Sequence, residues 1–310
     1  MTIKKCERGE YSQALAMMNK AFGLKENELE NMLPSCTPFE KNATDEQISR
    51  HFIALKDSEV IGCAGAYPSE VRLGGGETVK AFGVGQVCVR KEERGAGVMT
   101  ACLSAAIADA VDGGAELGYL WGHMPRYAHF GFAPAGAKAE FKDIVIGRFT
   151  KNSGTKNFTA RRASREDVAE LSVLYGRYEF RAVRTEEQWF ERLNRSNVDC
   201  YYSPDGAYLF ANNGGNTVVE IQGGPEAARG LLAFYAAERG LERIGAQYPL
   251  IRGGGDGLFE LLYSSANWFS VGPTALAAVY GNGERTAALR KIFWENGTSG
   301  DFWISPLDEV

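Results

Sequence analysis

The chain has 310 residues, of which 45% are hydrophobic and 24% are charged. This composition is typical of a globular protein with a full hydrophobic core, and it excludes disordered, collagen-like and coiled-coil chains. The formal net charge is −5, and basic and acidic residues are balanced in both halves of the chain. The sequence therefore has no basic region of the kind that binds nucleic acid, and none of its apolar runs reaches the roughly 18 residues that cross a bilayer.

The N-terminus and the cysteines indicate the compartment. Residues 1–13 read MTIKKCERGEYSQ, in which no apolar segment follows the lysines as it would in a secretory signal. The six cysteines contain no CxxC pair and are too scattered for a disulfide framework. The three histidines form no HExxH motif. We therefore expect a cytoplasmic protein with reduced thiols, no metal site, no membrane partner and no nucleic-acid partner.

The first half of the chain alternates short strands with amphipathic helices. Between residues 24 and 50 the sequence is polar and irregular, and Gly74–Gly76 marks a hairpin turn. Strands are predicted at residues 2–6, 51–55, 60–67, 80–90, 117–121 and 141–146, and helices at 10–22 and 98–111. This pattern predicts a mixed α/β fold of the α+β type.

A boundary is predicted at residues 149–157, which are polar, contain glycine and lack an apolar pattern. It divides the chain into a first domain at 1–150 and a second at 158–310. The two domains begin alike, since TIKKCERGEYSQAL at 2–15 aligns with TARRASREDVAELS at 159–172. A repeat at an offset of one domain length predicts a duplicated fold.

Chemistry is concentrated in residues 83–111, GVGQVCVRKEERGAGVMTACLSAAIADAV. An apolar strand leads through a basic, glycine-containing turn directly into a helix. Gly95 and Gly97 let backbone N–H groups approach a ligand, and the helix start offers unpaired N–H groups and the positive end of its dipole. Arg94 adds a charged donor. Together these features predict an anion site suited to a pyrophosphate.

Two common nucleotide-binding motifs do not fit this turn. A P-loop requires GK[ST] after its glycines, which is absent from the segment. A dinucleotide fingerprint requires a third small residue where Thr100 stands.

The turn and a later segment together resemble the GNAT family of acetyl-CoA-dependent N-acetyltransferases. The family's turn motif, [QR]-x-x-G-x-[GA], reads Arg94-Gly95-Ala96-Gly97-Val98-Met99, with Met99 in place of a small residue. The later segment reads Tyr127-Ala128-His129-Phe130-Gly131-Phe132. The sequence is most similar to the Eis-like branch, which has two tandem GNAT domains. Relatives in that branch usually add a sterol-carrier-like third domain of about 100 residues, which this length does not accommodate.

The resemblance implies a fold, a reaction and a set of site residues. The reaction would be direct attack of a primary amine, on a small molecule or a peptide, on acetyl-CoA in a ternary complex. The backbone of Val87, Cys88 and Val89 would pair with the pantetheine arm, and one N–H would polarise the thioester carbonyl. Tyr127 would protonate the leaving thiolate as general acid. The pyrophosphate would lie on Arg94, Gly95, Ala96, Gly97, Val98, Met99 and Thr100, and the thiol end would contact Gly122 and His123.

The second half carries a weaker copy of the turn. At the corresponding place it reads Gln222-Gly223-Gly224-Pro225-Glu226, where proline removes an N–H and Glu226 puts negative charge where a phosphate would lie. Residues 252–257 fit the letters of the motif but follow the wrong strand. We therefore expect a degenerate second GNAT-like domain that shapes the acceptor side.

Several alternatives stay open at this stage. His123 is either a base for the amine or an ordered polar residue, and Tyr127 could be a core tyrosine. Cys88 has no histidine at a recognisable spacing, which favours a structural thiol. The main alternative function is a non-catalytic acyl-CoA-binding regulatory or scaffolding protein, suggested by Met99 and the unidentified base; a nucleotide-binding protein is the third. The acceptor is not specified, and the sequence allows a homo-oligomer.

Overall fold

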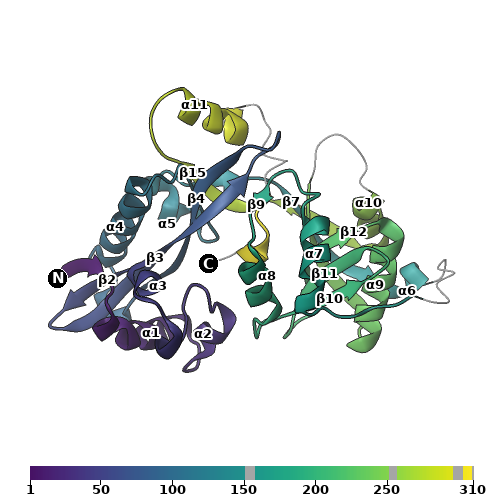
Figure 1. The fold of residues 1–310 in the computed structure, drawn as a ribbon, viewed down its shortest axis with the longest axis horizontal. Helices are drawn as coiled ribbons and strands as arrows, with labels where there is room; N and C mark the ends of the chain where they lie inside the picture. Colours follow the sequence, from purple (N-terminus) through teal and green to yellow (C-terminus); the bar gives the residue numbers. More distant parts are fainter. Residues whose placement is uncertain (151–157, 251–256, 296–302, 309–310) are drawn as a thin grey trace.

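The computed structural model describes residues 1–150, 158–250, 257–295 and 303–308. Two mixed β-sheets lie beside each other, each with helices packed on its faces (Figure 1). The mixed α/β fold predicted from the sequence is confirmed. In the described part of the chain, every helix is too short or too polar to cross a membrane.

The first sheet contains the predicted anion-binding strand near its middle. Its order is β1 (Thr2–Lys5), β2 (His51–Lys56), β3 (Glu59–Arg72), β4 (Thr78–Val89), β5 (Leu117–Leu120), β15 (Ala275–Val279) and β6 (Ala133–Ala135), and β9 (Arg181–Ala182) pairs with the far end of β3. Strands β4 and β5 are parallel, whereas their neighbours pair antiparallel. This sheet holds every site residue that the sequence predicts, on its strands or on the connections between them.

The second sheet repeats this order. It runs β14 (Trp268–Gly272), β7 (Lys138–Val145), β13 (Arg243–Pro249), β12 (Thr217–Gly223), β11 (Ala207–Asn212), β10 (Val198–Ser203) and β8 (Arg161–Arg162). Here β12 and β13 form the parallel pair, as β4 and β5 do in the first sheet. Two tandem GNAT-like units are thus visible in the strand order itself.

The repeat at the start of each unit has a structural counterpart. Strand β1 leads into a helix whose capping box joins Glu7 and Glu10, and β8 leads into a turn whose capping box joins Ser164 and Asp167. These pairs occupy equivalent positions in the aligned segments. Each box satisfies backbone N–H groups that a helix start leaves free.

The two units exchange a strand. Strand β15, from the second half, lies between β5 and β6, and β7, from the first half, lies between β13 and β14. The sheets therefore do not follow the predicted division at 1–150 and 158–310. The predicted linker falls largely on residues 151–157, which lie outside the described residues.

The helices cover the sheets on both faces (Figure 1). Those before the predicted linker are α1 (Arg8–Phe22), α2 (Glu28–Met32), α3 (Asp45–Ser49), α4 (Val98–Asp112), α5 (Met124–Tyr127) and α6 (Ile146–Thr150). Those after it are α7 (Val168–Tyr175), α8 (Glu186–Leu193), α9 (Pro225–Glu238), α10 (Gly257–Ser265) and α11 (Glu284–Arg290). The helices predicted at 10–22 and 98–111 are confirmed as α1 and α4. The region predicted to be irregular, 24–50, instead contains α2, α3 and a short 3₁₀ turn, Glu40–Asn42.

Helices α1 and α4 pack on opposite faces of the first sheet. Leu103 and Ala106 of α4 are buried in one cluster with Phe82 and Val84, whereas Met18 of α1 belongs to a different cluster. Fully burying a large apolar side chain contributes about 1.5–3 kcal/mol relative to exposure. Burial on both faces therefore fixes β3 and β4 at the centre of the unit.

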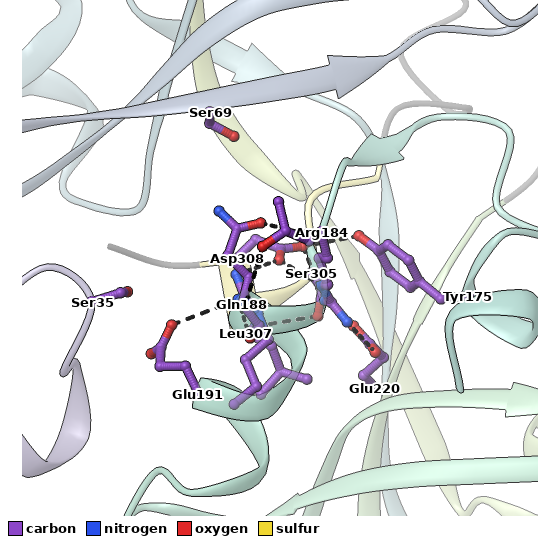
Figure 2. A network of polar contacts seen from close by, with 12 residues as sticks. Ser35, Ser69, Tyr175, Arg184, Gln188, Glu191, Glu220, Ser305, Leu307 and Asp308 are labelled. Carbon is purple, nitrogen blue, oxygen red and sulfur yellow. Dashed lines mark hydrogen bonds and ion pairs between the residues drawn. The ribbon is translucent and has the colours of Figure 1, made fainter. Parts of the chain in front are cut away.

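A buried ionic cluster holds the segment Trp303–Asp308 between the two sheets. Figure 2 shows Arg184 between Glu220 and Asp308, with Tyr175 alongside. Arg184 donates two hydrogen bonds to each carboxylate, at 2.7–2.9 Å to Glu220 and 2.8–3.0 Å to Asp308. Arg192 and the Tyr175 hydroxyl donate to Asp308 as well, at 2.9 and 3.0 Å. All donors converge from the second half of the chain on one carboxylate of the last segment.

Candidate functional site

Strands β4 and β5 separate after a short stretch of pairing. Parallel pairing joins Ala81–Gly83 to Leu117–Tyr119, and the register goes no further. Beyond it, residues 84–89 of β4 continue without a β5 partner. The backbone groups on that side of β4, including those of Val87–Val89, therefore have no partner on β5.

A β-bulge lies at the point where the two strands separate. On β3, Gly65 pairs with Gly85 and Cys63 with Cys88, so that Ala64 stands opposite two residues of β4. One of the two is Gln86, whose φ is +51°. Such a bulge bends its strand and increases its twist, which turns the end of β4 away from β5.

The side chains along this segment alternate between the two faces. Val87 and Val89 pack in the cluster under α4, whereas the Cys88 thiol lies 3.7 Å from the Met17 sulfur on the α1 side. Burial raises the pKa of the Cys88 thiol to about 12. The thiol is therefore protonated near neutral pH, which fits a structural role better than a nucleophilic one.

The turn that follows is open to a ligand. Gly95 and Gly97 have φ of +85° and +77°, in the left-handed region that favours glycine, and a Cβ added at either would meet no atom within 4 Å. Gly97 is the N-cap of α4 and no side chain caps that helix. The first N–H groups of a helix of 15 residues therefore face the turn with the positive end of its dipole.

A groove of about 620 Å³ runs between α1 and this turn. Val89 and Arg94 line it, and Arg94 also donates to the Val89 carbonyl at 3.4 Å. Lys20 and Lys91 bring further positive charge to the walls, where Glu92 supplies a carboxylate, and Arg90 also lines the groove but is ion-paired with Glu59. The groove is thus suited to an anionic ligand.

Across the opening, Tyr127 covers the end of β5. Its ring carbon Cε2 lies 2.6 Å from the place that a Cβ on Gly122 would occupy, so only glycine fits beneath it. The ring also contacts Phe132 edge-on, with the two centroids 6.4 Å apart. Half-burial raises the pKa of the Tyr127 phenol, and the nearby Arg126 opposes this. His123 is exposed at the start of α5.

The site residues follow the last pair of the two strands on either side. That pair is Gly83–Tyr119; Gln86 lies three residues beyond it on β4, and Gly122 lies three residues beyond it after β5. Val87 and Tyr127 both pack against the cluster under α4. The predicted pyrophosphate turn lies at the far end of that opening, at the start of α4.

Sequence reasoning did not single out Gln86. It is only 5% exposed, and its side-chain oxygen is buried with no hydrogen-bond partner among the described residues. The signal in the sequence is a lone polar residue in the apolar strand GVGQVCV.

Asp308 does not supply the base that the sequence left unidentified. Burial alone would raise the pKa of its carboxyl group, but Arg184 and Arg192 hold that pKa at about 2. Both oxygens already accept hydrogen bonds from these arginines and from Tyr175. Within the described residues, no group of three or more histidine, cysteine or acidic side chains is placed to bind a metal ion.

Comparison with known proteins tests the resemblance. Residues 2–135 match the family described as acetyltransferase (GNAT) domain. The predicted resemblance to the GNAT family is confirmed. The match covers all elements of the opening, from β1 to β6, and no curated protein matches the chain.

Solved structures extend the likeness to both GNAT-like units. A GCN5-related N-acetyltransferase from Kribbella flavida has a TM-score of 0.70 at 20% identity, covering 90% of this chain and 70% of that one. A probable N-acyltransferase of Enterococcus faecalis V583 gives 0.68 at 19%, with 90% and 72% covered. Eis1 from Mycobacterium abscessus gives 0.61 at 17%, with 90% and 73% covered. At these identities the likeness shows a shared tandem fold.

Proposed function

We propose that this protein is an acetyl-CoA-dependent N-acetyltransferase that acts on the primary amine of a small molecule or peptide. The family match supports acyl transfer in general. The observation that carries the proposal is the opening between β4 and β5. One end faces an uncapped helix N-terminus, and the other lies beneath Tyr127.

Acetyl-CoA would lie along this opening as the co-substrate. The pyrophosphate would accept hydrogen bonds from the backbone of Gly95–Thr100 and from Arg94, since the turn has open N–H groups and a basic groove beside it. The pantetheine arm would pair with the free edge of Val87–Val89, as an added strand does. Its thiol end would then come level with Gly122 and His123.

The reaction would be a direct transfer. The amine lone pair attacks the thioester carbon to form a C–N bond, and an N–H of β4 stabilises the developing oxyanion. The C–S bond then breaks, and Tyr127 donates its proton to the sulfur while the new amide nitrogen loses its extra proton to water. The raised pKa of the half-buried phenol keeps it protonated near neutral pH. General acid catalysis of this kind typically contributes about 10²–10⁴-fold.

One acetyl-CoA would bind per chain, because the second unit lacks the same turn. Pro225 stands at the first position of α9, where it removes an N–H, and Glu226 follows it. In addition, Gly224 is extended, with φ −65° and ψ 148°. The second unit would instead shape the acceptor side through the segment that the Arg184 cluster holds between the sheets.

The test measures the turnover of acetyl-CoA with a panel of primary amines, using the release of free CoA as the readout. Tyr127→Phe keeps the ring over Gly122 and removes only the proton donor. We expect its kcat to fall at least about 10²-fold, while affinity for acetyl-CoA changes by less than about 1 kcal/mol. Tyr263→Phe is the matched control, because Tyr263 is 49% exposed in the second unit, and it should retain parental turnover.

The second candidate is a non-catalytic acyl-CoA-binding regulatory or scaffolding protein. Met99 favours it, since a larger side chain stands where the family has a small one. Acetyl-CoA binding without CoA release for any amine would support this candidate and refute catalysis. Turnover by Tyr127→Phe above half the parental rate, with chemistry rate-limiting, would refute the acid role of Tyr127.

A further inference from the structure

Gln86 combines three features that a purely structural residue rarely shows together. Its backbone adopts φ +51°, a conformation that glycine adopts freely. The same strand has glycine at two nearby positions, Gly83 and Gly85, but not here. Its side chain is almost fully buried, yet the carboxamide oxygen has no partner among the described residues. A buried acceptor without a donor costs free energy, which a ligand donor would recover.

The position of Gln86 says which part of a ligand it would meet. If the pyrophosphate lies at Gly95–Thr100, the pantetheine arm runs back along β4 and ends near the bulge. Gln86 is at that bulge, three residues beyond the last β4–β5 pair, just as Gly122 beneath the Tyr127 ring is three residues beyond that pair on the β5 side. It therefore lies at the reacting end of the opening, next to the segment whose N–H would polarise the thioester.

The chemical groups at the reacting end limit which of them can donate a hydrogen bond to the Gln86 oxygen. A thioester carries no N–H or O–H, so the acetyl group has nothing to give to a carboxamide oxygen. The attacking amine does, because a primary amine keeps two N–H bonds beside the lone pair that attacks. The pantetheine amides also carry N–H groups, but pairing with the free edge of β4 would use them. The remaining donor at this end is the acceptor amine itself.

We propose that the Gln86 carboxamide oxygen accepts a hydrogen bond from the attacking amine and orients its lone pair toward the thioester carbon. The inference rests on the proposed function and adds the residue that selects for an N–H-bearing acceptor. Gln86 takes up no proton in this step; the C–N bond forms, and the extra proton leaves the nitrogen for water as before. Orienting a nucleophile in this way is a recognised source of rate acceleration.

Unreactive CoA thioethers test this without knowledge of the natural acceptor. S-(N-methylcarbamoylmethyl)-CoA carries an amide N–H near the position of the attacking amine, and S-(methoxycarbonylmethyl)-CoA has an ester oxygen there instead. Calorimetry should show that the parent protein binds the amide about tenfold more tightly than the ester, as one buried hydrogen bond predicts.

Three variants separate the side chain from the backbone. Gln86→Leu and Gln86→Gly both remove the acceptor, and the glycine variant also relieves the positive φ. Both should bind the two thioethers within about twofold of each other, whereas Gln86→Glu, which keeps an acceptor oxygen, should retain the preference for the amide.

The outcomes distinguish the two proposals. A parent protein that binds CoA but does not prefer the amide, or a glycine variant that keeps the preference, would overturn the role of Gln86 and leave acetyl-CoA binding intact. If neither thioether nor CoA itself binds the parent, the proposed function fails, and the role of Gln86 fails with it.

Discussion

The ionic cluster around Arg184 allows a sharp test of how the last segment is held. Arg184 and Glu220 have fully buried side chains, and Asp308 is 1% exposed. With Arg192 the cluster contains two cations and two carboxylates, so it is neutral as a whole. Glu220→Gln keeps the shape of the side chain and the Tyr208 hydrogen bond partner, but it leaves one positive charge in excess.

The losses of unfolding free energy from the two single substitutions should therefore not add up in the double variant. Removing one partner of a buried ion pair typically costs about 3–5 kcal/mol of unfolding free energy, since an uncompensated charge remains. We expect that loss for Glu220→Gln and for Arg184→Met alone. The double variant leaves the neutral Arg192–Asp308 pair, so its loss should be about that of one single variant, a coupling of at least about 3 kcal/mol.

Urea unfolding monitored by tryptophan fluorescence measures these free energies. The Arg184 guanidinium lies 4.7 Å from the Trp189 ring centroid, so one of the five tryptophans lies against the cluster. If the double variant loses the sum of the two single losses to within about 0.5 kcal/mol, the partners are independent and the reasoning is wrong.

Two further predictions concern the turn and a buried histidine. Gly97→Val should abolish acetyl-CoA binding in calorimetry, because a branched side chain at φ +77° blocks the approach of the ligand to the backbone. Gly206→Val is the control, since Gly206 has φ +93° and equally open space around it. This control should strain the fold and leave binding unchanged. Burial lowers the pKa of His51 to about 4, and His51 is neutral in the fold, accepting from the Tyr67 hydroxyl at 2.9 Å. The folded pKa of His51 lies below the unfolded value of about 6.5, so the stability that neutral His51 contributes is complete above pH 6.5. This contribution should fall by up to about 3 kcal/mol as the pH drops to 4. Urea unfolding midpoints of the parent and of a His51→Phe variant, compared over this pH range, measure the loss. A flat midpoint over this range in the parent would contradict the assignment.

The local elements of the first unit could be predicted from its sequence because their signals are local. The apolar periodicity of residues 98–111 and the glycines at both ends determine α4, and the turn residues determine the β3–β4 hairpin. The short helix α3 was missed although its capping box, Thr44 with Gln47, is a readable signal.

Other features depend on contacts that the sequence pattern does not encode. An apolar strand such as β15, ALAAV, could join either sheet, and only the packing of the whole chain decides which. The bulge at Gln86 likewise follows from the register between β3 and β4, since one residue on β3 must face two on β4. The sequence pattern therefore could not predict the strand exchange or the carboxamide of Gln86 that lacks a hydrogen-bond partner among the described residues. It could predict the turn at Arg94–Thr100, because the signals for a turn are local.

The strand exchange makes the first unit depend on the second. Strand β15 fills the place between β5 and β6, and Tyr280, which follows it, packs on Phe132 and donates to the Phe130 carbonyl at 3.1 Å. These contacts hold the segment that carries Tyr127.

A fragment of residues 1–150 would leave the paired edges of β5 and β6 open and would remove the support of the Tyr127 segment. Open apolar edges favour aggregation. We expect this fragment to be insoluble or unfolded by circular dichroism and unable to bind acetyl-CoA. Coexpression with residues 151–310, which supply β15, should restore both properties. A fragment that folds and binds acetyl-CoA alone would show that β15 is dispensable, and the position of Tyr127 would then have to be fixed by contacts within the first half.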